Sequence, residues 1–265
     1  MTIPNYELYA LRYAVNSAQR SVHNFIDGDV HDVPMPLDYF VWVIRGHGVK
    51  YIVDTGFDAE AAASRQRTLL ATPAELLGLL DIDAATATDV IITHLHYDHA
   101  GNRHLFPRAR FHLQDREMAY ATGRCMCHPG LRAAFDGRDV AAMVERVYAG
   151  RVVFHEGVDE LAPGIVLHRL GGHTDGLQIV RVHTRRGWMV LASDASHLYA
   201  NMEQSRSFPI VYNVGDMYEG HRTCYRLADG PGNVIPGHDP LVMSRYPAAA
   251  PGLGDRIVRL DADPL

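Results

Sequence analysis

The stretch that decides the fold is Val90–Gly101, which reads VIITHLHYDHAG. Its first four residues are apolar or β-branched, as in a buried strand, and its final glycine marks a turn. The residues between them include three histidines and one aspartate: His94, His96, Asp98 and His99. Imidazole and carboxylate are ligands that zinc and similar divalent metals accept. The spacing therefore predicts a metal-binding loop at the end of a strand, with ligands close enough together to serve two ions.

Three later positions share the same local pattern, in which an apolar run and a small residue precede a ligand type. They are His173, Asp194 and His238. Asp194 follows the apolar run Trp188–Ser193, and a carboxylate is costly to bury there unless it is paired or bound to a metal. Ligands from several strand ends in one place are what a strand-end active site requires. We therefore expect these side chains to join the histidine-rich loop.

Composition and charge exclude several classes of protein. Apolar residues make up 47% of the 265 residues and charged residues 21%, which is ordinary for a globular enzyme. The net charge of −6 and the lack of a basic patch argue against nucleic-acid binding. No apolar run approaches the length of about 18 residues that a membrane span needs, and the N-terminus lacks the apolar core of a signal peptide. We expect a cytoplasmic protein that binds neither membrane nor nucleic acid.

The three cysteines also favour a reducing compartment, because their number is odd and their spacing forms no disulfide framework: Cys125, Cys127 and Cys224. Cys125-Met126-Cys127-His128 has no second cysteine pair, so we interpret it as a structural segment. Its place in an insertion after the first half of the chain suggests a lid over the pocket.

Short strands and helices alternate along the chain. We expect strands over residues 6–15, 39–45, 49–53, 89–93, 111–113, 152–154, 165–170, 178–184 and 188–193. Helices are expected over residues 58–70, 73–80, 116–122 and 140–148, with Thr72 as the N-cap of the second and Pro73 at its first position. No linker is visible, so a single domain over residues 1–265 is the expected organisation.

Taken together, these motifs resemble the five-motif signature of the metallo-β-lactamase superfamily. The signature comprises His94-x-His96-x-Asp98-His99, followed by His173, Asp194 and His238. The sequence VDTG at Val53–Gly56 resembles the first motif of that family, and the resemblance covers residues 40–240. It implies an α/β fold of four layers, the αββα sandwich, in which two mixed β-sheets face each other with helices on the outer faces. The metals would lie at one edge between the sheets.

The resemblance also implies a role for each motif residue. His94, His96 and His173 would bind one metal, and Asp98, His99 and His238 the other. Asp194 would bridge the two together with a water or hydroxide. Two Zn²⁺ ions are expected, although iron, manganese or cobalt also suit these ligands. Asp98 would move a proton to the leaving group, and Asp54 would orient a metal ligand.

Within the superfamily, the chain looks most similar to the N-acyl homoserine lactonase branch. The similarity rests on His94–Gly101, on Ser193-Asp194-Ala195-Ser196 and on Gly237-His238-Asp239. The bridging aspartate separates this branch from the lactamases, which hold a cysteine there. The branch implies a hydrolase that opens a lactone ring with a metal-bridging hydroxide. We expect a small-molecule lactone or ester as its substrate and no other partner, in a protein that is a monomer or a homodimer.

One position departs from the lactonase pattern. Those enzymes hold a tyrosine three residues after the bridging aspartate, where its hydroxyl contacts the substrate, and this chain has His197. His197 could donate a hydrogen bond in its place and is a candidate catalytic residue beside Asp98 and Asp194. The change leaves open another lactone, a cyclic amide, an ester or a thioester as the substrate. An iron-dependent oxidoreductase resembling the persulfide dioxygenases is a further alternative, but those use one iron, whereas all seven ligand positions are filled here.

Overall fold

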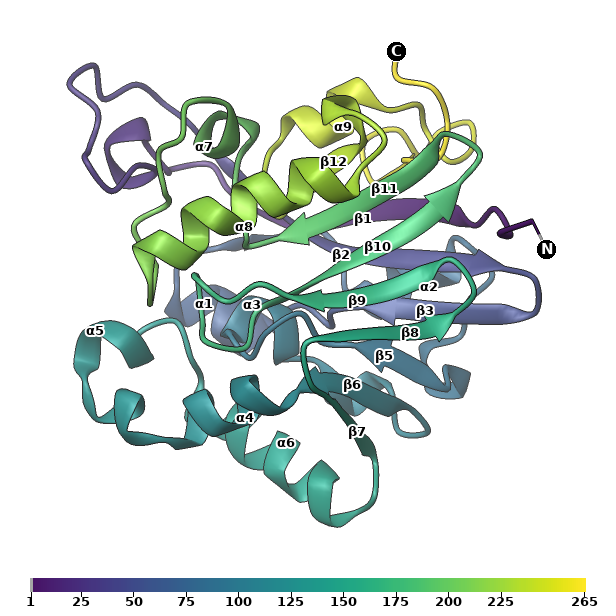
Figure 1. The fold of residues 1–265 in the computed structure, drawn as a ribbon, viewed down its shortest axis with the longest axis horizontal. Helices are drawn as coiled ribbons and strands as arrows, with labels where there is room; N and C mark the ends of the chain where they lie inside the picture. The colour runs from purple at the N-terminus through teal and green to yellow at the C-terminus, as the bar shows by residue number, and fades with distance from the viewer. Residues whose placement is uncertain (1) are drawn as a thin grey trace.

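The computed structural model describes residues 2–265 and contains two mixed β-sheets (Figure 1). Over this range, eight strands form the large sheet, in the order β13-β1-β2-β3-β5-β6-β7 with β4 beside β1. Five strands form the small sheet, in the order β12-β11-β10-β9-β8. The strands are β1 (Glu7–Asn16), β2 (Leu37–Gly46), β3 (Val49–Val53), β4 (Thr68–Leu69), β5 (Asp89–Ile91), β6 (Arg110–Gln114), β7 (Val152–His155), β8 (Val158–Ala162), β9 (Ile165–Arg169), β10 (Gln178–Thr184), β11 (Gly187–Ser193), β12 (Val234–Pro236) and β13 (Ile257–Arg259).

Helices cover the outer faces of both sheets (Figure 1). On the large sheet, α2 packs on β1, α4 on β6 and α6 on β7, whereas α8 packs on β11 of the small sheet. The helices are α1 (Ala59–Ser64), α2 (Pro73–Gly78), α3 (Tyr97–Ala100), α4 (Asp115–Thr122), α5 (Pro129–Arg132), α6 (Gly137–Tyr148), α7 (Tyr199–Glu203), α8 (Val214–Leu227) and α9 (Leu241–Arg245). The expected αββα sandwich is therefore confirmed. Within the described residues, no helix combines the length and the apolar character that a membrane span needs.

Burial on both faces of the large sheet explains why its strands are almost continuously apolar. Successive side chains of a strand point to opposite faces. In β1, Leu8 and Ala10 pack against the small sheet, in a cluster with Leu167 and Ile179. Tyr9 and Leu11 belong to the cluster on the other face, which includes residues of α2 and α6. The sheet is therefore the central layer between two cores.

The predicted start of α2 is confirmed in detail. The hydroxyl of Thr72 accepts a hydrogen bond from the backbone N–H of Glu75, and the Glu75 side chain accepts one from the backbone N–H of Thr72. Pro73 occupies the first turn. This reciprocal capping box satisfies backbone donors that a helix start leaves unpaired.

Two expectations about secondary structure were wrong or incomplete. The helix expected over residues 58–70 ends at Ser64, and Gln66 has a φ of 55°, which interrupts a helix. Thr68 and Leu69 instead pair with β1, so the helix stops where the alanine-rich part of the segment ends and tertiary pairing takes over. Helix α8 and strand β8 were not predicted. Gly215 and Gly220 weaken the helical signal of α8, although its N-cap, Asn213, is a typical helix start.

The topology brings the predicted ligands to the carboxyl ends of strands. Strands β3 and β5 are parallel in the large sheet, and β11 and β12 are parallel in the small sheet. Strand β9 runs in the same direction as β11, because both are antiparallel to β10. The ligand-bearing segments follow β5, β9, β11 and β12. Each segment therefore leaves its sheet at the carboxyl end of a strand, and the loops at these ends carry the candidate ligands.

Candidate metal centre

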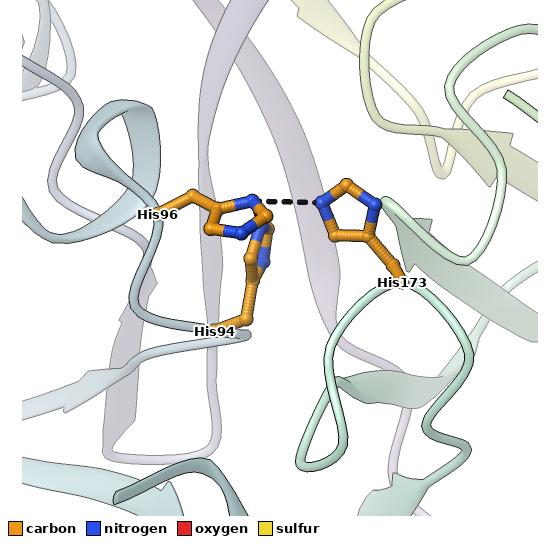
Figure 2. Close-up of side chains that lie close together, drawn as sticks. All are labelled: His94, His96 and His173. Carbon is orange, nitrogen blue, oxygen red and sulfur yellow. Dashed lines mark hydrogen bonds between the residues drawn. The ribbon is translucent and has the colours of Figure 1, made fainter. Parts of the chain in front are cut away.

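The first group of predicted ligands consists of three buried histidines, His94, His96 and His173, and Figure 2 shows them converging from two loops. His94 and His96 follow β5, whereas His173 lies in the turn between β9 and β10. The Nδ1 atom of His96 is 3.0 Å from Nε2 of His94 and 2.9 Å from Nε2 of His173. Nitrogen ligands on a tetrahedral zinc ion are about 3.4 Å apart. The three nitrogens therefore form a site close to the size that such an ion needs.

The second group consists of Asp98, His99 and His238. Asp98 and His99 lie in the first turn of α3, which begins directly after His96, and His238 follows β12. The Oδ2 atom of Asp98 is 3.8 Å from Nε2 of His99 and 3.7 Å from Nε2 of His238. This group can hold a second cation beside the first.

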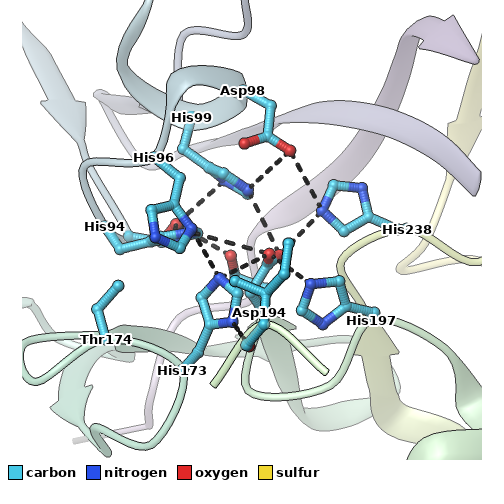
Figure 3. A network of polar contacts seen from close by, with 12 residues as sticks. His94, His96, Asp98, His99, His173, Thr174, Asp194, His197 and His238 are labelled. Atoms are coloured by element: carbon cyan, nitrogen blue, oxygen red, sulfur yellow. Dashed lines mark hydrogen bonds and ion pairs between the residues drawn. The ribbon is translucent and has the colours of Figure 1, made fainter. Parts of the chain in front are cut away.

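Asp194 lies between the two groups, as Figure 3 shows. Its Oδ2 atom is 3.2 Å from Nε2 of His173 and 3.8 Å from Nε2 of His94. Its Oδ1 atom is 3.4 Å from Nε2 of His99 and 3.0 Å from Nε2 of His238. Each carboxylate oxygen therefore faces one group. The structure brings all seven predicted ligands into a single cluster.

Unpaired polar atoms test whether these residues fit metal ions. Nε2 of His99 and Oδ1 of Asp194 are buried and have no hydrogen-bond partner among the described residues. A buried polar atom without a partner costs about 1–3 kcal/mol. Both atoms point into the space that the second group surrounds, where a divalent cation would satisfy them. The donor set, imidazole nitrogen and carboxylate oxygen, also suits zinc and similar metals.

Hydrogen bonds on the far side of the imidazoles fix their orientation. Nδ1 of His99 donates to Oδ2 of Asp54 over 2.7 Å. His173 and His238 donate from Nδ1 to main-chain carbonyls, over 2.7 and 2.9 Å. With the proton on Nδ1, Nε2 is left with its lone pair free for a metal. Asp54 therefore fixes the ring of His99, a predicted ligand, and its φ of 64° is an unusual backbone conformation for a residue other than glycine.

Burial and charge set the protonation states of the cluster in the metal-free protein. Burial, followed by the neighbouring imidazoles, lowers the pKa of His94 and His96 well below the usual value. Burial also lowers the pKa of His99, but the carboxylates of Asp194 and Asp54 outweigh it and raise that pKa well above the usual value. Burial raises the pKa of Asp194, but the surrounding imidazoles lower it far more. A metal ion bound by His99 would therefore displace a proton, and we expect metal affinity to fall in acid.

His197 lies directly against Asp194. Its Nε2 atom is 3.0 Å from Oδ2 of Asp194, and its ring stacks on Phe208 with centroids 3.7 Å apart. Burial lowers the pKa of His197 to about 3, so the imidazole is neutral near pH 7. Both rings border the pocket above the ligands. His197 therefore forms part of the pocket wall directly beside Asp194.

Glu117 in α4 supports the site, although the sequence analysis did not identify it. Its carboxylate is fully buried, and Oε1 accepts a hydrogen bond from the backbone N–H of Leu95 over 2.8 Å. Oε2 accepts from the Thr174 hydroxyl over 2.6 Å and from the Gly176 N–H over 3.2 Å. One carboxylate thus joins the loop of His94 to the loop of His173. Its neighbours Asp115 and Arg116 are polar, so the local sequence resembles an exposed helix start.

We expect Glu117→Gln to weaken metal binding about 10- to 100-fold, because an amide nitrogen would face one of three hydrogen-bond donors and displace a ligand loop. Competition with a chromophoric chelator measures the affinity. Glu145→Gln, an exposed position on α6, is the matched control and should leave the affinity unchanged. An unchanged affinity in the Glu117 variant would contradict the role assigned to this carboxylate.

A pocket of about 310 Å³ opens over the predicted ligands. Its floor includes His96, Asp98, Asp194 and His238. The insertion that follows α4 contributes to the wall through Gly130, Ala133 and Ala134, whereas residues 125–128 do not line the pocket. Other walls are formed by Gln19, His23, Leu37, Tyr39, Arg65, Arg67, Tyr97, His173, His197, Phe208, Pro209 and Ile210.

The facing sheets and the histidine–aspartate cluster at their edge define a metal-binding protein of the αββα class. A family model described as the metallo-beta-lactamase superfamily matches residues 35–246. The chain therefore belongs to the metallo-beta-lactamase superfamily, whose members include hydrolases. No curated protein sequence matches the chain.

Several solved structures share this fold. A mutant of AiiA from B. thuringiensis, with N-decanoyl-L-homoserine bound at its active site, has a TM-score of 0.70 at 19% identity, over 91% of this chain and 96% of that one. AidC, a dizinc quorum-quenching lactonase, has a TM-score of 0.69 at 15% identity, over 91% and 90%. A probable metal-dependent hydrolase from Staphylococcus aureus has a TM-score of 0.74 at 13% identity, over 100% and 96%. At these identities, the similarity establishes the fold.

Proposed function

We propose that this protein is a dinuclear metal-dependent hydrolase that opens a lactone ring. The observation that carries the proposal is the position of Asp194, whose two carboxylate oxygens each face a separate group of three ligands. A residue with two such oxygens can serve two ions at once. N-acyl homoserine lactonases share the fold, and their structures contain an opened lactone product at the active site, which supports this choice of reaction.

The metals, with zinc as the first choice, would be held by the two groups of ligands with Asp194 in common. Two bound divalent ions would polarise a carbonyl oxygen and make a water molecule acidic enough to react near neutral pH. The neutral imidazoles of His94 and His96 are already in the state that metal binding requires.

Asp98 is proposed to move the proton that ring opening needs. When the carbonyl carbon–ring oxygen bond breaks, the leaving oxygen takes up a proton and becomes a hydroxyl group. Asp98 borders the pocket, and its Oδ2 atom is turned towards the ligands His99 and His238. Its Oδ1 atom could then take the proton that the attacking water gives up and pass it to the leaving oxygen.

His197 is proposed to contact the substrate. It borders the pocket and is neutral at working pH. Its Nε2–H can donate to Oδ2 of Asp194 in the free enzyme, and to a substrate carbonyl once Asp194 is engaged by metals. The stacking of the ring on Phe208 holds it in place for either contact.

The experiment that tests the function combines metal analysis with hydrolysis of a substrate panel on one purified sample. The panel contains acyl homoserine lactones, simple γ- and δ-lactones, a cyclic amide, an aryl ester and a glutathione thioester, and acid release is followed at constant pH. We expect two divalent ions per chain and the fastest hydrolysis with a lactone. One iron per chain without hydrolysis would contradict the proposal and indicate an oxidoreductase instead. Preference for the amide or thioester would keep the metal centre but change the substrate class.

A further inference from the structure

Two arginines border the same pocket as the predicted metal ligands. Arg65 directly follows α1, and Arg67 directly precedes β4, so both come from the segment that was expected to be helical. The only acidic residues that line the pocket within the described chain are Asp98 and Asp194, and both lie among imidazoles of the metal centre. The two guanidinium groups therefore have no acidic residue of their own in the pocket.

Arg65 has a structural role that accounts for its position. Its guanidinium group lies 3.9 Å from the centre of the Tyr97 ring. Its terminal nitrogens donate to the main-chain carbonyls of Ala133 and Phe135 over 3.1 and 3.2 Å. Arg65 thus ties the insertion to α1 and completes one wall of the pocket.

Arg67, in contrast, uses little of its hydrogen-bonding capacity. Its Nε atom donates to the Tyr97 hydroxyl over 3.4 Å, and the Tyr39 hydroxyl lies beside the same guanidinium group. Neither terminal nitrogen makes a hydrogen bond of 3.5 Å or less within residues 2–265. No carboxylate lies within ion-pair distance of Arg67 in residues 2–265, whereas the partly buried Arg12 and Arg103 each have one, at 3.2 and 2.6 Å. A guanidinium group keeps its charge in proteins, so Arg67 presents an uncompensated positive charge at the pocket wall.

We propose that Arg67 binds an anionic group of the substrate, so that the preferred substrate is a lactone or ester that carries a carboxylate. This inference rests on the proposed hydrolase function and names its substrate class. The two free terminal nitrogens of Arg67 match the two oxygens of a carboxylate in the bidentate geometry that arginine favours. The pocket volume of about 310 Å³ suits a compact substrate that reaches from the metal ligands to this wall.

The test uses two matched lactones, a γ-butyrolactone with a carboxylate on the ring and the same ring with a primary amide in its place. We expect the kcat/KM of the wild-type holoenzyme to be at least ~10-fold higher for the lactone with the carboxylate than for the lactone with the amide. Arg67→Gln should lower kcat/KM for the lactone with the carboxylate by ~30-fold and change kcat/KM for the lactone with the amide by less than ~3-fold, since only the carboxylate loses charge-assisted hydrogen bonds. Arg67→Lys should retain part of the activity on the carboxylate, because lysine keeps the positive charge but cannot form two parallel hydrogen bonds.

Arg108→Gln is the matched control, because Arg108 is exposed and lies outside the pocket, and it should retain the wild-type preference. Equal wild-type rates on the two lactones would overturn the inference. An equal loss on both in Arg67→Gln would overturn it as well, since that pattern indicates a structural role through Tyr97.

Calorimetric binding of the ring-opened dicarboxylate product separates this inference from the proposed function. Binding that depends on Arg67, in a protein that hydrolyses neither lactone, would support the anion site and overturn the lactonase proposal. Hydrolysis of lactones with product binding that is unchanged in Arg67→Gln would support the lactonase proposal and overturn the anion site.

Discussion

Asp194→Asn is expected to lower kcat/KM for lactone hydrolysis by about 10³-fold or more and to leave fewer than two metal ions per chain. The substitution keeps the shape of the side chain but removes its negative charge. Five imidazole nitrogens lie within 3.8 Å of the carboxylate, those of His94, His99, His173, His197 and His238. An amide offers one oxygen, so it cannot serve both groups of ligands. A loss of about 10³-fold corresponds to ~4 kcal/mol, which is in the range of metal-assisted charge stabilisation.

Elemental analysis of dialysed protein and steady-state kinetics on the same sample measure the two effects. Asp263→Asn is the control, because Asp263 is exposed near the C-terminus and far in sequence from the cluster. It should bind metal and hydrolyse lactones as the wild type does. Two tightly bound ions in Asp194→Asn, with activity within ~3-fold of the wild type, would show that Asp194 is not a shared ligand.

Gly176→Ala is expected to destabilise the fold by about 3 kcal/mol or more. A Cβ atom at this position would lie 2.0 Å from the backbone nitrogen of Glu117 and 2.3 Å from its Cα. These are main-chain atoms of α4, so no side-chain rotation relieves the clash. Relief requires the turn after β9 to move away from α4, which would break the hydrogen bonds that Glu117 makes to Thr174 and Gly176.

Denaturant unfolding of the metal-free protein measures this loss without a contribution from metal binding. Gly137→Ala is the matched control, because a Cβ atom there meets nothing within 4 Å and the residue lies at the start of α6. The control should be neutral or slightly stabilising. Unfolding of Gly176→Ala at the wild-type midpoint would mean that α4 and the turn can separate at no cost.

Local patterns predicted most of the strands because both sheets are built from short apolar runs bounded by turns. The helix start at Thr72 was predictable for the same reason, since its capping box lies within four residues. The segment after Ser64 was not, because β4 exists only by pairing with β1, more than fifty residues earlier. Pairing over such a distance leaves no periodic signal in a segment of two residues.

The sequence by itself predicted the seven candidate ligands and, through its resemblance to a known family, the sandwich fold that carries them. His94, His173, Asp194 and His238 follow an apolar run or a glycine, and His96, Asp98 and His99 come within five residues of His94, so a few neighbouring residues are enough to predict them as ligands. Only the tertiary structure decided that the two oxygens of Asp194 face different groups, that Glu117 joins two ligand loops, and that Arg67 lacks an acidic partner. The physical reason is that the burial and pairing of a charged side chain depend on residues far away in the chain. The sequence does not distinguish a buried glutamate from an exposed one, or a paired arginine from an unpaired one. They differ only in the residues that the fold places around them.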